Sequence, residues 1–175
     1  MISKRLNEIV REYYLSGRLD ESFVMDAVKH TLGGDVKRAN SNEDREKHID
    51  FWWKSPRKGV IGIDVKGIKK NSRNDSQLDD TINWLELKSV DGKPGWLYGQ
   101  AEYIAFRTFT KILFVKRDKL LEFALEKIKD KDIVGYNPKD FYIPYKRFKR
   151  QDVILKVPTS DLEKMCDFCI DCENE

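Results

Sequence analysis

The most constraining feature of the sequence is a pair of β-rich segments joined by a short turn. The segments span residues 49–53 and 60–68, and the sequence between them contains Ser-Pro-Arg-Lys-Gly. Short runs of β-branched and aromatic residues around a Pro- and Gly-containing turn are typical of a β-hairpin. The sequence therefore predicts two antiparallel strands here.

The second segment alternates in polarity. Ile61, Ile63 and Val65 alternate with polar or small residues that include Asp64 and Lys66. Successive side chains of a strand point to opposite faces of the sheet. We therefore expect the three apolar residues on one face, and Asp64 with Lys66 on the other.

A second carboxylate, Asp50, lies in the first segment, with thirteen residues between it and Asp64. Pairing about the turn would bring Asp50 close to Asp64 and Lys66. Two carboxylates can hold a hard divalent cation, and a lysine beside them can assist attack at phosphorus. An alternative stays open, because an Asp and a Lys two residues apart on a strand are also typical of a weak surface ion pair.

The spacing D-x(13)-D-x-K, with its hairpin and apolar alternation, resembles the PD-(D/E)XK nuclease superfamily. The resemblance covers about residues 20–116, and the superfamily includes small phage, restriction and Holliday-junction-resolving enzymes. Ile49 stands where the motif has proline, and Asp64 stands where glutamate is commoner. The resemblance implies an α/β (α+β) fold with a restriction-endonuclease-like core, in which helices flank a mixed central sheet of about 4–5 strands.

The same resemblance implies a divalent-metal-dependent endonuclease that hydrolyses phosphodiester bonds in DNA with Mg²⁺ or Mn²⁺. Asp50, Asp64 and Glu21 are the expected metal ligands, and Glu21 alternatively is an acidic residue favoured in the first turn of a helix. The expected catalytic residues are Asp50, Asp64, Lys66 and Glu86. Glu86-Leu87-Lys88 is also a competing second motif, because a strand predicted over residues 81–90 could bring Glu86 beside Asp64.

Basic residues are the expected contacts to nucleic acid, and they fall in two segments. A net charge of +3 is too small to indicate nucleic acid binding by itself, so these local clusters carry the prediction. An edge strand protected by its charges is an equally good interpretation of the second segment. The expected nucleic-acid-binding residues are Lys69, Lys70, Arg73, Lys146, Arg147, Lys149 and Arg150.

The length of 175 residues suits a single domain over residues 1–175. Within it we predict an N-terminal helix over residues 1–17, a core over about 20–128, and a basic strand segment with a C-terminal helix over 140–175. We find no apolar run long enough to span a membrane and no signal peptide, so the sequence predicts an intracellular, cytoplasmic protein without a membrane partner. The size resembles that of phage-encoded nucleases, and both a monomer and a homodimer stay open.

Three local predictions concern the first helix, a segment in the middle of the chain, and the cysteines. A helix is expected to begin with Asp20 as its N-cap and to end at Gly33-Gly34. Residues 99–106 are expected to be helical. Cys166, Cys169 and Cys172 are expected to be reduced thiols on a short terminal helix, although three thiolates could also bind zinc or part of an iron–sulfur cluster.

A rival function of a different class is a non-catalytic nucleic-acid-binding or assembly module with the same fold. It would keep the hairpin and the basic segments but would not use a metal for cleavage. A protein-interaction domain with surface ion pairs is a third interpretation, and it leaves Asp50 and Asp64 without a role. The sequence does not distinguish DNA from RNA, or branched from linear or single-stranded substrates.

Overall fold

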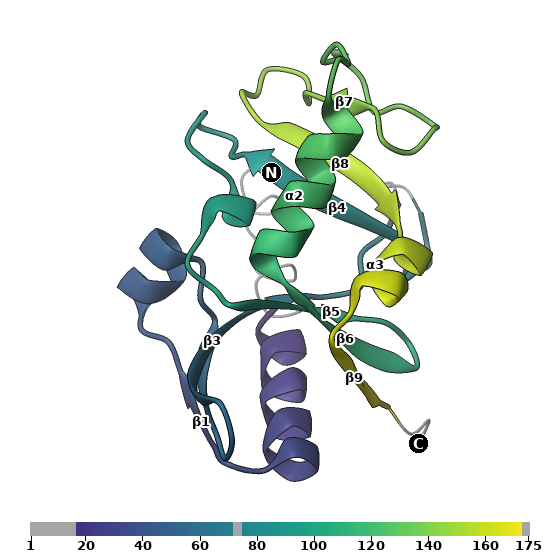
Figure 1. Cartoon of the computed structure of the whole chain (residues 1–175). Helices are drawn as coiled ribbons and strands as arrows, with labels where there is room; N and C mark the ends of the chain where they lie inside the picture. Colours follow the sequence, from purple (N-terminus) through teal and green to yellow (C-terminus); the bar gives the residue numbers. More distant parts are fainter. Residues whose placement is uncertain (1–16, 72–74, 173–175) are drawn as a thin grey trace, which may run out of the picture.

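The computed structural model describes residues 17–71 and 75–172 (Figure 1). Helical residues 17–27 continue into a π-helical turn, η1, and the remaining elements follow it along the chain. In order, the elements are η1 (Val28–Leu32), β1 (Asp35–Arg38), η2 (Glu43–Lys47), β2 (Phe51–Ser55), β3 (Gly59–Lys66), β4 (Ile82–Lys88), η3 (Trp96–Tyr98), β5 (Tyr103–Arg107), β6 (Lys111–Lys116), α2 (Arg117–Ile128), β7 (Pro144–Tyr145), β8 (Val153–Pro158), α3 (Thr159–Met165) and β9 (Phe168–Asp171).

The main sheet of the described chain has six strands in the order β1-β2-β3-β5-β6-β9. Strands β3 and β5 are parallel, and the other neighbouring strands are antiparallel. The predicted hairpin is confirmed, with Ser55 opposite Gly59 at its turn. The fold is therefore mixed α+β, as expected, but the sheet is wider than predicted.

A second sheet of three strands has the order β4-β8-β7. The predicted strand over residues 81–90 is present as β4, but it pairs with β8 and lies outside the main sheet. The expectation that β4 would be the neighbour of β3 is therefore wrong. β5 takes that place, because its short apolar run can be buried on both faces beside a parallel strand.

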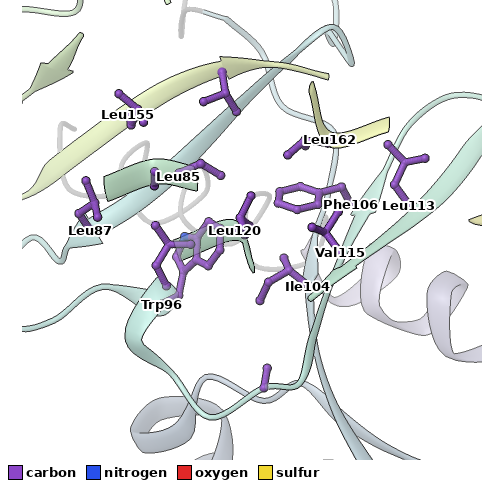
Figure 2. Close-up of a cluster of buried hydrophobic side chains, with 14 of the residues drawn as sticks. Leu85, Leu87, Trp96, Ile104, Phe106, Leu113, Val115, Leu120, Leu155 and Leu162 are labelled. Carbon is purple, nitrogen blue, oxygen red and sulfur yellow. The ribbon is translucent and has the colours of Figure 1, made fainter. Parts of the chain in front are cut away.

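Each face of the main sheet is covered by its own hydrophobic core. On one face Val24 and Val28 pack against Ile61, Ile63 and their neighbours, which places the helical residues 17–27 there. On the other face the second sheet, α2 and η3 enclose a core that includes Leu85, Leu120, Leu155 and Phe106 (Figure 2). Both faces of β3 are thus covered by protein, and the face that carries Asp64 is not an open surface.

The structure corrects two predictions near the start and the middle of the chain. Asp20 lies inside the helix rather than at its N-cap, and its carboxylate pairs with Arg107. Residues 99–106 are not helical, because β5 occupies 103–107. The short apolar run from Tyr103 to Phe106 fits a doubly buried strand as well as a helix, so periodicity could not separate the two. The helix does end at Gly33-Gly34, where φ is 70° and 86°.

The cysteines do not share a terminal helix. α3 ends before Cys166, Cys169 lies in β9 and Cys172 follows it, so the prediction is wrong for their placement. Cys166 packs against one core and Cys172 against the other. All three are free thiols. The predicted N-terminal helix, apart from residue 17, and Arg73 lie outside the described residues.

Candidate active site

Asp50 lies immediately before β2, and its hydrogen bonds to β3 hold it beside Asp64. The backbone N–H of Asp50 donates to the carbonyl of Ile63 at 2.9 Å, and the strand pairing then continues with Phe51 opposite Ile63. The carboxylate of Asp50 reaches across to β3, where its Oδ2 accepts a hydrogen bond from Val65 N–H at 2.6 Å. The D-x(13)-D spacing therefore brings the two aspartates together, as the hairpin predicted.

Lys66 completes a compact group with the two aspartates. Its Nζ donates to Asp64 Oδ1 at 2.7 Å and lies 4.7 Å from the centre of the Trp96 ring. Asp64 is only 3% exposed, so this pair is not the solvated ion pair that a short D-x-K motif usually makes. The prediction that Asp64 and Lys66 share one strand face is confirmed, and their catalytic role stays a prediction.

Burial and mutual repulsion change the acidity of these groups. Burial, together with the neighbouring Asp64 charge, raises the pKa of Asp50 to about 7. Burial also raises the pKa of Asp64, and the nearby Lys66 ammonium only partly offsets it. For Lys66, burial alone would lower the pKa, but the Asp64, Asp50 and Glu86 carboxylates outweigh burial and raise it. Lys66 is therefore a cation at neutral pH, whereas Asp50 is close to half protonated.

One atom of the group lacks a partner. Asp64 Oδ2 is buried and, while Asp50 is ionised, accepts no hydrogen bond from any residue of the described chain. A buried carboxylate oxygen without a donor is costly. A proton on Asp50 or a bound cation would satisfy this atom, and either would also relieve the repulsion between the two carboxylates.

Glu86 approaches this group from the second sheet. Burial raises the pKa of Glu86, while the charges of Lys66, Arg147, His48 and Lys69 act to lower it. Glu86 therefore lies within electrostatic reach of Lys66, although it comes from a different sheet. A register shift in the β4–β8 pairing between Glu86 and Lys88 interrupts the alternation that the competing Glu86/Lys88 motif requires.

His48 and Trp96 belong to this site but were not predicted from the sequence. Burial and the Lys66 charge lower the pKa of His48, and the Glu86 and Asp50 charges partly offset this by acting to raise it. His48 stands two residues before Asp50 and is one of two histidines in the chain, and this position in the sequence indicates that it lies near the site. Trp96 reaches the site only through the fold of η3, and nothing local in the sequence indicates this.

Glu21 lies close to Asp50, but its carboxylate already forms ion pairs with two arginines. Burial and the Asp50 charge raise the pKa of Glu21. Its carboxylate also pairs with Arg38, and with Arg18 at 3.6 Å. These arginines give Glu21 a structural role between the helical residues 17–27 and β1, and its predicted role as a metal ligand stays a prediction.

The described residues contain no group of three or more His, Cys, Asp or Glu side chains placed to hold a metal ion. Asp50 and Asp64 alone are nevertheless compatible with Mg²⁺. This ion is commonly bound by one or two carboxylates and completes its shell with water and substrate phosphate oxygens. The unpartnered Asp64 Oδ2 is the atom best suited to such a ligand role.

Two of the predicted basic residues, Lys69 and Arg147, lie within electrostatic reach of the carboxylates. Lys69 is exposed along part of its side chain, yet partial burial of its ammonium and the Lys66 charge lower its pKa. Lys70 is exposed as well. The Arg147 charge acts on both Glu86 and Lys69, which places the start of the second basic segment beside the carboxylates.

The second basic segment is mostly a loop rather than a strand. Only Pro144–Tyr145 form β7, at the edge of the three-stranded sheet, so the edge-strand interpretation fails for residues 146–150. Arg147 pairs with the fully buried Asp152. The other three cations, at positions 146, 149 and 150, are exposed and can face a polyanion.

Comparisons with protein-family models, with curated proteins and with solved structures found no match. In the described part of the chain, no helix is both long enough and apolar enough to cross a membrane. Function is therefore inferred from the chemistry of the site itself.

Proposed function

We propose that this chain is a divalent-metal-dependent nuclease of the PD-(D/E)XK type that cuts DNA. The observation that carries the proposal is the buried group of Asp50, Asp64 and Lys66, in which Asp64 Oδ2 has no donor among the described residues while Asp50 is ionised. An ion pair with a purely structural role would not need two opposed carboxylates for one ammonium. The order of a helix, three antiparallel strands and a parallel strand beside β3 is consistent with a restriction-endonuclease-like core.

The chain supplies both the ligands and a charged group for this chemistry. Asp50 and Asp64 would hold Mg²⁺ or Mn²⁺, and Glu86 would support the site from the second sheet. Such an ion, when bound, activates water and neutralises charge at phosphorus. Lys66 is protonated, so it acts as a fixed cation that donates to a phosphoryl oxygen or orients water, and it is not a general base.

Asp50 makes ion binding dependent on pH. The carboxylate must lose its proton before it can ligate a cation, and its pKa is about 7. Metal affinity should therefore rise as the pH increases through this value. Lys69, Lys70 and the exposed cations of the loop, Lys146, Lys149 and Arg150, would contact the phosphate backbone around this centre.

The test is divalent-dependent cleavage of plasmid, linear duplex, single-stranded and four-way-junction DNA, with RNA for comparison. We expect the wild type to cut at least one DNA form with Mg²⁺ or Mn²⁺ and to stop when a chelator is added. Asp64→Asn should lose this activity by orders of magnitude, whereas Asp26→Asn at an exposed helical position should keep it. Equal cleavage by wild type and Asp64→Asn would contradict the proposal.

A second candidate is a nucleic-acid-binding module without cleavage. It is favoured by the lack of a third metal-binding side chain beside Asp50 and Asp64 in the described chain, and by the arginines that already engage Glu21. It predicts binding to DNA with no cleavage of any form. The same assay separates the two candidates.

A further inference from the structure

A pocket of about 510 Å³ lies away from the carboxylates, against the first three strands of the main sheet. Lys37, Trp52, Lys54 and Val60 are among the residues that line it. Its volume is within the range of sites that hold small molecules, roughly 300–1,000 Å³. Neither the proposed catalytic group nor the predicted basic segments account for this pocket.

The pocket and the carboxylates lie on the same face of the sheet. Lys37 is opposite Trp52, and Lys54 is opposite Val60, so these four side chains share one face. Val60 and Asp64 are four residues apart on β3, and side chains an even number of residues apart on a strand point the same way. Trp52 is opposite Gly62, two residues from Asp64 on β3, so the pocket begins about 7 Å from Asp64 along the strand direction, from the strand rise of about 3.3 Å per residue.

The Trp52 ring is fixed in the wall of the pocket. Its Nε1 donates to Glu43 Oε1 at 3.1 Å. On β3 the opposing residue is Gly62, where a Cβ would come within 3.2 Å of Trp52 Cζ3 and 3.0 Å of Ile49 Cδ1. Glycine thus leaves room for the indole beside β3. An aromatic ring that is held in place before binding loses little conformational freedom when a ligand stacks on it.

The charges around the pocket suit a nucleotide better than a simple anion. Lys37 and Lys54 are both exposed cations. Asp35 and Glu43 stand beside them in the pocket wall, so the pocket offers acceptors as well as donors. A nucleotide carries a phosphate for the lysines, a π-face for the tryptophan and donors on its base edge.

We propose that this pocket binds an unpaired nucleotide of a single-stranded segment next to the bond that is cut. The base stacks on Trp52, and Lys37 and Lys54 contact the flanking phosphates. A base inside a duplex is already stacked and paired, so only a single-stranded or locally opened segment can place a base in the pocket. The inference rests on the proposed nuclease function and specifies its substrate as DNA with a single-stranded part.

The test measures binding in a chelator, so that cleavage does not take part. A fluorescein-labelled oligothymidylate and a matched duplex are titrated with the full chain, and anisotropy is recorded at several salt concentrations. Trp52→Leu should weaken binding of the single strand about five- to a hundred-fold, while Trp52→Phe should stay close to wild type because it keeps a ring. Lys37→Ala with Lys54→Ala should flatten the log–log salt slope by about 0.7 for each phosphate interaction removed.

The matched control is Lys29→Ala with Lys129→Ala, two exposed lysines outside the pocket. It should leave both affinity and slope unchanged. Thermal unfolding of each variant separates loss of binding from loss of fold, and the two-lysine variant tests the pocket even if Trp52→Leu is unstable.

The inference is overturned if the two-lysine variant binds the single strand with the affinity and salt slope of the wild type, or if a folded Trp52→Leu protein binds it like the wild type. It is also overturned if the wild type binds the duplex as tightly as the single strand. Metal-dependent cleavage is scored separately. Binding that depends on Trp52 without any cleavage would support the pocket and refute the nuclease, and cleavage without dependence on Trp52 would do the opposite.

Discussion

Asp50→Asn is expected to make the metal-free protein more stable, and by more at high pH than at low pH. The substitution keeps the size of the side chain and an oxygen that can accept the hydrogen bond from Val65 N–H. It removes the ionisable group whose charge is disfavoured by burial and by Asp64. The effect should therefore appear as a pH-dependent difference between the two proteins.

The sign and size follow from the pKa. The carboxyl of Asp50 has a pKa of about 7 in the folded chain, against its usual value of 3.8. The folded state holds the proton more tightly, so this stabilising contribution is complete below about pH 4 and is lost as the pH rises through 7. Between about pH 5 and pH 8 the wild type should lose about 2.5 kcal/mol of stability relative to Asp50→Asn.

The assay is urea unfolding of both proteins at a series of pH values in a chelator. Asp26→Asn is the matched control, because it makes the same chemical change at an exposed helical position. As a surface substitution it should change the free energy of unfolding by no more than about 0.5 kcal/mol. Added Mn²⁺ should then stabilise the wild type, by about 2.7 kcal/mol at a hundred times its Kd, and should stabilise Asp50→Asn much less. Parallel stability curves for wild type and Asp50→Asn across this pH range would contradict a raised pKa at Asp50.

Three further predictions concern the surface and the C-terminal region. Replacing Lys146, Lys149 and Arg150 together by Ala should weaken duplex DNA binding. The slope of log affinity against log salt concentration should flatten by about 0.9 for each phosphate interaction removed. An unchanged slope would exclude this loop from the interface. Arg147→Ala should instead lower the free energy of unfolding by about 2 kcal/mol, because it leaves the buried Asp152 without its cation. The control Lys93→Ala, which breaks an exposed ion pair, should leave the free energy of unfolding almost unchanged in the same assay. Cys169→Ser should leave both the melting temperature and the metal content of the purified protein unchanged, and stoichiometric zinc or iron that disappears with the variant would contradict this.

The hairpin could be predicted from the sequence because its information is local. Alternation at Ile61, Ile63 and Val65 determines the faces, and the turn determines the register that brings Asp50 beside Asp64. Both properties depend on residues within about twenty positions of one another. The part of the site that is built from this hairpin was therefore accessible without a structure.

The rest of the site depends on how distant segments pack. β4 follows β3 in the sequence, yet it pairs with β8 near the end of the chain and leaves the place beside β3 to β5. Glu86 and Trp96 reach Lys66 only because of this arrangement. No periodicity within either segment encodes it. The pocket at Trp52 is not predictable from the local sequence for a similar reason, because its lining residues come from β1 and β3 as well as from β2.

The most direct test of a catalytic role for the buried group compares the wild type with Lys66→Ala. Both DNA cleavage and DNA binding are measured for each protein. Lys66→Ala removes the cation that Asp64 holds at 2.7 Å and leaves both aspartates in place. Single-turnover cleavage of the preferred DNA form with Mn²⁺ should fall by about two to three orders of magnitude, as expected when one group that stabilises charge in the transition state is removed. Binding of the same DNA in chelator should change less than about tenfold. Cleavage by Lys66→Ala at the wild-type rate would contradict the assignment of Asp50, Asp64 and Lys66 as the catalytic group.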